Sequence, residues 1–236
     1  GIHYVGHLSG RGDRLSSKGR LETGAGNADI QLSKNGKNIQ AKIATKGIAL
    51  DRILANKTFG QVATTIEVKG NKDHLVAKGE ISRFDYNKYS FRNIRLDGQY
   101  NHGIVKGLAS IDDPNIRVDI EGNYAIKGNK YAINTHIDHL QPSILGVKMA
   151  DKDYSLDDID LSANNQSSDS YLDLEAPFMS LHARGQYNLS TLVSSIQNMI
   201  AEKLPTLPGI KKTKAKGDND FTLQGNIYST EVLNKI

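Results

Sequence analysis

The stretch from Gly79 to Ile126, GEISRFDYNKYSFRNIRLDGQYNHGIVKGLASIDDPNIRVDIEGNYAI, decides the fold class of this chain. It holds successive strand-turn-strand patterns, and from Ile116 to Glu121 apolar and charged residues alternate at every position. Successive side chains of a β-strand point to opposite faces, so this alternation predicts a strand with one buried face and one solvated face.

The same pattern extends on both sides of this stretch. Tight polar turns between short alternating strands are typical of antiparallel meanders. Single helical turns are expected at residues 51–55 and 141–145, which are too short for more than one turn. The other alternating runs are found at residues 28–32, 39–43, 62–68, 75–81, 131–137, 159–163, 172–176, 181–189 and 220–227.

The alternation has one irregularity inside the opening stretch. Tyr89 and Phe91 share one face, whereas Ile94 and Leu96 fall on the other face in strict alternation. A β-bulge inserts an extra residue and returns the side chains to a common face. We therefore predict a bulge near Asn93.

One amphipathic helix is predicted near the C-terminus, over residues 190–204. Apolar residues recur there at three- and four-residue spacing, Ser190 is a suitable N-cap, and Pro205 follows the last turn. A basic loop over residues 205–219 comes next. We interpret the helix as covering part of the sheet and the loop as solvated, with contact to an anionic membrane surface as the alternative.

The composition restricts the class of protein. The chain has 236 residues, no Cys, no Trp and a formal net charge of +4, and its basic residues are mostly scattered. The lack of Cys excludes disulfides and thiolate chemistry, and no apolar run approaches the ~20 residues of a transmembrane helix. Basic residues do not interleave with aromatic residues, so no nucleic-acid partner is expected.

The expected fold is all-β, because the chain offers so little helix to cover a sheet. The apolar face must then be buried against a second sheet or by curling of the sheet on itself. Gly107, Gly122 and Gly185 at strand positions favour strong bending. From the pattern alone, a curved groove, a β-sandwich and a closed β-barrel remain alternatives.

No catalytic residue and no metal site is predicted. His136 and His139 are three apart on an expected strand, so their side chains should point to opposite faces and should not bind one ion. The acidic residues from Asp151 to Asp160 lack the spacing of a calcium loop, and the other His residues are too scattered for a Ser-His-Asp triad. We expect no enzyme activity and no cofactor.

The chain resembles the TamB family of the AsmA-like superfamily of Gram-negative bacteria over residues 44–204. Members of this family repeat a G-x-I-x-x-F-x-Y-x-x-Y-x-(Y/F)-x-N-I-x-L-x-G unit, followed by a G-x-(L) element, D-P-N and an alternating strand. The later stretch LDLEAPFMSLHARGQYNL continues the resemblance. The positions that match the unit are Gly79, Ile81, Phe84, Tyr86, Tyr89, Phe91, Asn93, Ile94, Leu96, Gly98, Gly107, Leu108, Asp113, Pro114 and Asn115.

The resemblance implies an elongated, strongly curved antiparallel meander that forms a U-shaped, "β-taco"-like groove. Residues 1–236 would then be one continuous segment from the middle of a longer protein. The resemblance implies that this segment lies in the periplasm and that the parent protein is anchored in the inner membrane. It also implies phospholipid transport to the outer membrane and, through regions outside this chain, a partner barrel protein of the TamA or BamA type.

Two functions are compatible with these expectations. In the first, phospholipid acyl chains lie against the inward side chains, and each methylene shielded from water contributes about 0.8 kcal/mol. In the second, the sheet is a structural scaffold whose edges template other strands during outer-membrane protein assembly. An open apolar trough favours the first function, and a dry packed interior favours the second. The residues expected to line the groove are Val62, Ile66, Val68, Val105, Ala109, Ile111, Ile116, Val118, Ile120, Ile133, Ile137, Leu181 and Ala183.

Overall fold

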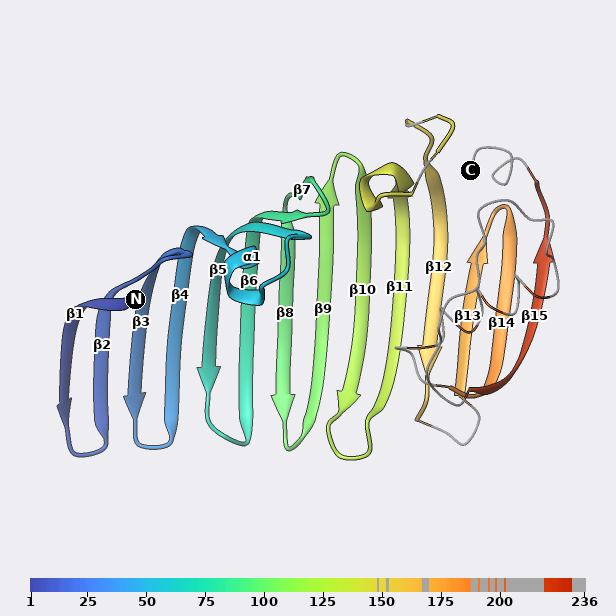
Figure 1. Cartoon of the computed structure of the whole chain (residues 1–236). Helices are drawn as coiled ribbons and strands as arrows, with labels where there is room; N and C mark the ends of the chain where they lie inside the picture. The colour runs from blue at the N-terminus through green and yellow to red at the C-terminus, as the bar shows by residue number, and fades with distance from the viewer. Residues whose placement is uncertain are drawn as a thin grey trace.

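The described part of the chain folds as a single antiparallel sheet of 15 strands, in which neighbours in the sequence are neighbours in space (Figure 1). The computed structural model describes residues 1–147, 149–151, 153–166, 170–187, 191, 195, 198, 202 and 219–230. Only β7 lies off the main path, where it pairs with β6. The expected all-β curved meander is confirmed, and because the sheet is single and open, the sandwich and barrel alternatives are wrong.

The elements follow the alternating runs of the sequence closely. Both expected helical turns are present, as α1 (Leu50–Leu54) and the 3-10 turn η1 (Pro142–Leu145). The strands are β1 (Ile2–Arg11), β2 (Arg14–Thr23), β3 (Gly26–Asn35), β4 (Asn38–Ala49), β5 (Phe59–Gly70), β6 (His74–Tyr86), β7 (Tyr89–Phe91), β8 (Ile94–Asn101), β9 (Ile104–Asp113), β10 (Ile116–Ala125), β11 (Lys130–Leu140), β12 (Leu156–Asn164), β13 (Ser170–Ala176), β14 (Met179–Gln186) and β15 (Asp220–Ile227).

The strand register collects the apolar side chains on one face. Val118 pairs with Ile111 of β9 and with Ile137 of β11, and Ile137 in turn pairs with Ile159 of β12. Directly paired residues of antiparallel strands share a face, so this apolar face continues from strand to strand. We call it the inner face. The outer face carries the alternate positions, such as Asp119, which are mostly polar or charged.

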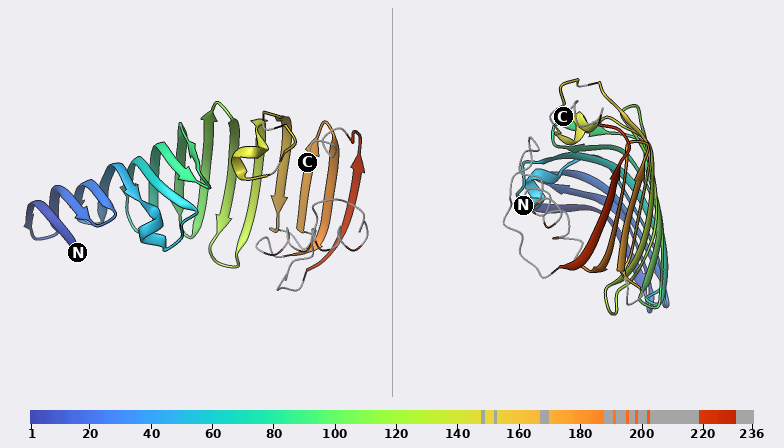
Figure 2. Two further views of the ribbon diagram at one scale, coloured as in Figure 1. Left: turned by 45° about the horizontal axis from the view of Figure 1, so that its top comes forward. Right: turned by 90° about the vertical axis from the view of Figure 1, so that its right-hand side faces the viewer.

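The sheet bends around the inner face. The end-on view of Figure 2 shows the strands as an arc, with α1 and η1 on the inner side of the bend. Ile144 of η1 packs there against Phe91, Ile94, Ile116 and Val118. We call these five residues the rim core. They close one end of the inner face, while η1 shields them from water.

The predicted bulge near Asn93 is present as a break between β7 and β8. Phe91 pairs with Phe84 and Ile94 pairs with Ile81, so both sides of the break keep their apolar residues on the inner face. Asn93 itself has a φ of 52°. Its side chain donates a hydrogen bond of 3.0 Å to the carbonyl of Asp112, which holds this left-handed conformation.

The predicted helix over residues 190–204 lies mostly outside the described residues. Thr191, Ser195, Asn198 and Glu202 are described, and each is helical. Asn219, just before β15, donates side-chain hydrogen bonds to the hydroxyls of Thr191 and Ser195, at 3.0 and 2.7 Å. The basic loop over residues 205–219 lies outside the described residues except for Asn219.

Candidate functional site: an apolar trough on the inner face

A trough with a volume of about 470 Å³ crosses the inner face from β5 to β11. Its floor follows a row of small residues, because Gly98 pairs with Ala77 and Gly107, and Gly107 pairs with Gly122. Without side chains along this row, the sheet leaves a channel that runs across the strands, and therefore along the length of the molecule. The side walls include Ile66, Leu96, Val105, Ala109, Ile120, Tyr124 and Ile133.

All the residues expected to line a groove lie on the inner face, but they differ in access. Val105 is among the most open, with 39% of its surface exposed, and the inner-face side chains of Ile66, Ile120 and Ile133 are half-buried. Ile111, Ile116, Val118 and Ile137 lie at the rim core instead, where Ile144 packs. Val62, Val68, Ala109 and Leu181 are half-buried, and Ala183 is fully buried.

The sequence-based list of lining residues missed several members of the trough. Leu96 is 38% exposed and Tyr124 is 40% exposed, and both line it. Leu96 lies between Arg95 and Asp97, and Tyr124 follows Asn123, so part of the alternating pattern was present in the sequence. Gly98 and Gly107 could not have been recognised as its floor, because only the register places them side by side.

A hydrogen-bonded cluster supports the rim beside the trough. Asp113 is 2% exposed and accepts hydrogen bonds from the Tyr89 hydroxyl and from the backbone N–H groups of Arg92 and Asn115, the last two at 3.0 Å. The Asn115 amide also donates to the Tyr89 oxygen, at 3.1 Å. Burial, together with the Asp113 carboxylate, raises the pKa of Tyr89 to about 12. Asp113 and Asn115 of the D-P-N element are therefore hydrogen-bonded to Tyr89 of the same repeated unit.

The outer face has a larger hollow of about 1070 Å³, between two rows of polar side chains. Its walls carry both signs of charge, and neighbours neutralise each other: Lys42 lies 2.6 Å from Glu67, and Lys78 lies 3.3 Å from Asp97. These pairs are largely exposed, and exposed pairs contribute little. We regard this hollow as a solvated furrow, because volume alone does not select a ligand and several of its opposite charges form pairs.

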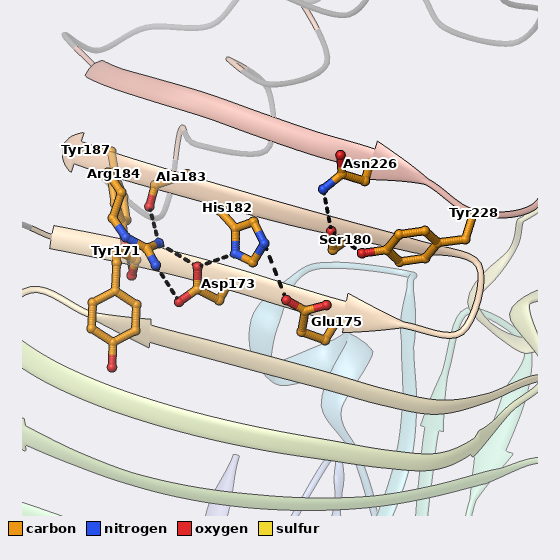
Figure 3. A network of polar contacts seen from close by, with 10 residues as sticks. All are labelled: Tyr171, Asp173, Glu175, Ser180, His182, Ala183, Arg184, Tyr187, Asn226 and Tyr228. Atoms are coloured by element: carbon orange, nitrogen blue, oxygen red, sulfur yellow. Dashed lines mark hydrogen bonds and ion pairs between the residues drawn. The ribbon is translucent and has the colours of Figure 1, made fainter.

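A polar network on β13 and β14 belongs to the same outer face (Figure 3). Arg184 and His182 both contact Asp173, with an Arg184 Nη2–Asp173 Oδ2 distance of 2.9 Å and a His182 Nδ1–Asp173 Oδ1 distance of 2.9 Å. Burial alone would raise the pKa of Asp173, but the hydrogen bonds from Arg184 and His182 outweigh it and lower the pKa. Ser180 bonds instead to Asn226 and Tyr228, at 3.3 and 2.9 Å.

The prediction that His136 and His139 point to opposite faces is wrong. The register shifts between Arg117 and Val118, so His136 pairs with Asp119 while His139 pairs with Arg117. The bulge at Asp138 thus turns both imidazoles to the outer face. A ligand atom from each of His136, Asp158 and Asp160 lies within 4.8 Å of the others, so these residues could share one cation.

Comparisons of the chain with protein-family models, with curated proteins and with solved structures found no match. Among the described residues, no helix is long and apolar enough to cross a membrane. The physical properties of the inner face therefore carry the functional interpretation.

Proposed function

We propose that the chain is a non-enzymatic, lipid-binding segment whose inner face holds phospholipid acyl chains. The observation that carries this proposal is the apolar trough, which stays open although it lies on the face that a soluble protein would normally bury. The resemblance to the TamB family adds the setting: a periplasmic segment of an inner-membrane-anchored protein that moves phospholipid towards the outer membrane. An outer-membrane barrel protein of the TamA or BamA type would be its partner.

The chemistry of the trough suits an acyl chain better than a polar ligand. The side chains that line it from Ile66 to Ile133 are mostly aliphatic, aromatic or absent, and its length runs across the strands. Each methylene removed from water contributes about 0.8 kcal/mol, and this attraction has no preferred direction. A half-covered chain would therefore be retained and still slide along the trough, while its headgroup stays in water.

A matched pair of substitutions tests this function. Leu96→Arg places a charge in the trough, whereas Ile104→Arg places the same charge on the outer face of the neighbouring strand, where Ile104 is 45% exposed and pairs with Asn101. We expect Leu96→Arg to reduce transfer of fluorescent phosphatidylethanolamine between vesicles at least about tenfold. Ile104→Arg should transfer lipid at the wild-type rate.

The proposal fails if both variants are folded and transfer lipid equally well. Co-purified phospholipid, counted by native mass spectrometry, gives an independent measurement that should follow the same order. Val118→Arg is a poor test, because Val118 is 7% exposed within the rim core and its replacement would also unfold the sheet locally.

A structural scaffold that assists outer-membrane protein assembly is the second candidate. It is favoured by β1, whose residues are all exposed at the edge of the described sheet. Such a scaffold would bind an unfolded barrel strand regardless of the trough. Equal binding by wild type and Leu96→Arg would support it over lipid transport.

A further inference from the structure

Three connections on one rim of the sheet form a continuous surface. α1 follows β4, the turn at Asn87 follows β6 and η1 follows β11, so all three leave the sheet at the same end of its strands (Figure 1). The Asn87 N–H donates to the Thr58 carbonyl at 2.8 Å, and the Asn87 side-chain amide donates to the Leu145 carbonyl at 3.2 Å. Asn87 therefore ties the segment after α1 to η1. We give the name rim surface to residues 53–58, 87–88 and 145–147.

The rim surface exposes large aliphatic side chains. Ile53 and Leu54 of α1 are 59% and 53% exposed, and no residue of α1 is buried. Leu145 and Val147 are 43% and 42% exposed, although Ile144 beside them packs into the rim core. Two residues are enough to connect β1 with β2, so the longer segments at α1 and η1 are not needed merely to join strands. Exposed aliphatic side chains gathered in this way are typical of a surface that binds a partner.

The charged part of the rim surface is basic. Lys57 and Lys88 flank the hydrogen bond that joins the segment after α1 to the turn after β6. Both lysines are exposed, and neither forms an ion pair within the described part of the chain. The acidic residues nearby are less available, because Asp85 is 18% exposed and lies 2.7 Å from Arg83, and Asp51 is half-buried. The two lysines can therefore neutralise an anionic partner.

We propose that the rim surface binds the surface of an anionic phospholipid bilayer. Aliphatic side chains of an interfacial protein segment enter the boundary between headgroups and acyl chains, while lysines beside them contact the phosphate groups. An anionic bilayer thus matches both properties of the rim surface. A neutral apolar partner would match the aliphatic side chains alone and would leave both lysines without opposite charges.

The opposite rim of the sheet has a different character. Ile104 and Ile126 are 45% and 53% exposed there, and the Ile126 N–H donates to the Gly103 carbonyl at 2.9 Å. Both isoleucines stand at tight turns of the sheet, whereas α1 and η1 project to the inner side of the bend (Figure 2). These two isoleucines therefore provide a matched control for the aliphatic side chains of the rim surface.

Binding through the rim surface would also orient the molecule. Because α1 and η1 lie on the inner side of the bend, a bilayer in contact with them would face the inner face and not the outer face (Figure 2). The trough would then open towards the lipid. The rim surface shares no residue with the trough, so this inference does not rest on acyl-chain binding.

Flotation of the protein with vesicles tests the proposal. Vesicles made of equal parts of phosphatidylcholine and phosphatidylglycerol are compared with vesicles of phosphatidylcholine alone. We expect the wild type to float with the anionic vesicles and to bind the neutral vesicles at least about tenfold more weakly, because each lysine near an anionic surface strengthens binding about fivefold.

Two double variants separate the aliphatic and the basic contributions. Ile53→Ser combined with Leu54→Ser removes exposed apolar surface, and Lys57→Glu combined with Lys88→Glu reverses both charges. Each double variant should weaken binding to anionic vesicles at least about tenfold. Loss in the serine variant without loss in the glutamate variant would overturn the proposal, since that pattern indicates a neutral apolar partner.

Matched variants of the opposite rim serve as controls. Ile104→Ser with Ile126→Ser, and Lys37→Glu with Lys127→Glu, make the same chemical changes there and should bind anionic vesicles as tightly as the wild type. Leu96→Arg, which alters only the trough, should also leave vesicle binding unchanged. The proposal is overturned if the wild type floats with neither kind of vesicle, or if any of these control variants loses as much binding as the rim-surface variants. Circular dichroism confirms that each variant compared is folded.

Discussion

At the scale of single residues, the carboxylate of Asp113 joins separate segments of the rim through its hydrogen bonds. It is buried at the rim and satisfied by a tyrosine hydroxyl and two backbone N–H groups. In the sequence, residues 113–115 are recognised only as the D-P-N element of the repeated unit. The structure shows that this turn is tied to Tyr89 of the preceding hairpin.

Removing this carboxylate should destabilise the sheet. Asp113→Ala leaves the Tyr89 hydroxyl and the N–H groups of Arg92 and Asn115 without their acceptor, so we expect a loss of about 3 kcal/mol in the free energy of unfolding. Tyr89→Phe removes one donor and should cost about 1–2 kcal/mol. Urea unfolding followed by circular dichroism measures both values. Equal stability of Asp113→Ala and wild type would show that the cluster contributes nothing.

The outer face makes a prediction about pH. The Asp160 carboxylate, which accepts a hydrogen bond from the imidazole, raises the pKa of His136 above its ordinary value near 6.5, and Asp138 adds to this effect. A raised pKa means that protonated His136 is favoured in the folded state, so its stabilising effect is complete below pH 6.5 and is lost as pH rises through the raised pKa. NMR titration should give His136 a pKa above 6.5, and Asp160→Asn should lower that pKa. An unchanged pKa in Asp160→Asn would contradict the assignment.

At the scale of elements, the break at Asn93 keeps two strands in phase. Its left-handed backbone costs a β-branched residue about 1–3 kcal/mol, and the Asn93 side chain also bonds to Asp112. Asn93→Val should therefore destabilise the protein more than Asn93→Gly, which tolerates the conformation and loses only the side-chain hydrogen bond. Thermal unfolding of both variants compares these effects directly. If Val were tolerated as well as Gly, the bulge would not need the left-handed residue.

At the scale of the whole molecule, an open sheet offers most strands only their two neighbours as partners. Strands near the rim core gain further contacts from η1, whereas β1 is exposed throughout and β2 is at best half-buried. Local opening should therefore be graded along the sheet. Hydrogen exchange measured by mass spectrometry should be fastest in β1 and β2 and slowest in β10 and β11. Uniform protection would indicate a single cooperative unit instead.

The sequence by itself determined the strands and the face on which each side chain lies. Alternation has a period of two, so a run such as Ile116 to Glu121 sets its own facing without reference to the rest of the chain. The same local rule located the bulge at Asn93. It was not applied at His136 and His139, although Leu140 falls out of phase with Ile137 and carries the same signal of a second bulge, at Asp138.

Only the tertiary structure decided that the sheet stays open and which inner-face residues are accessible. Whether a sheet stays open depends on the bend and twist accumulated over many strands. The alternation of apolar and polar residues cannot reveal this, because it is the same in an open sheet, a sandwich and a barrel. The trough depends on Gly98, Gly107 and Gly122 meeting across strands, and Val118 is covered because η1 folds back onto it. These are contacts between segments distant in sequence, which a local pattern cannot specify.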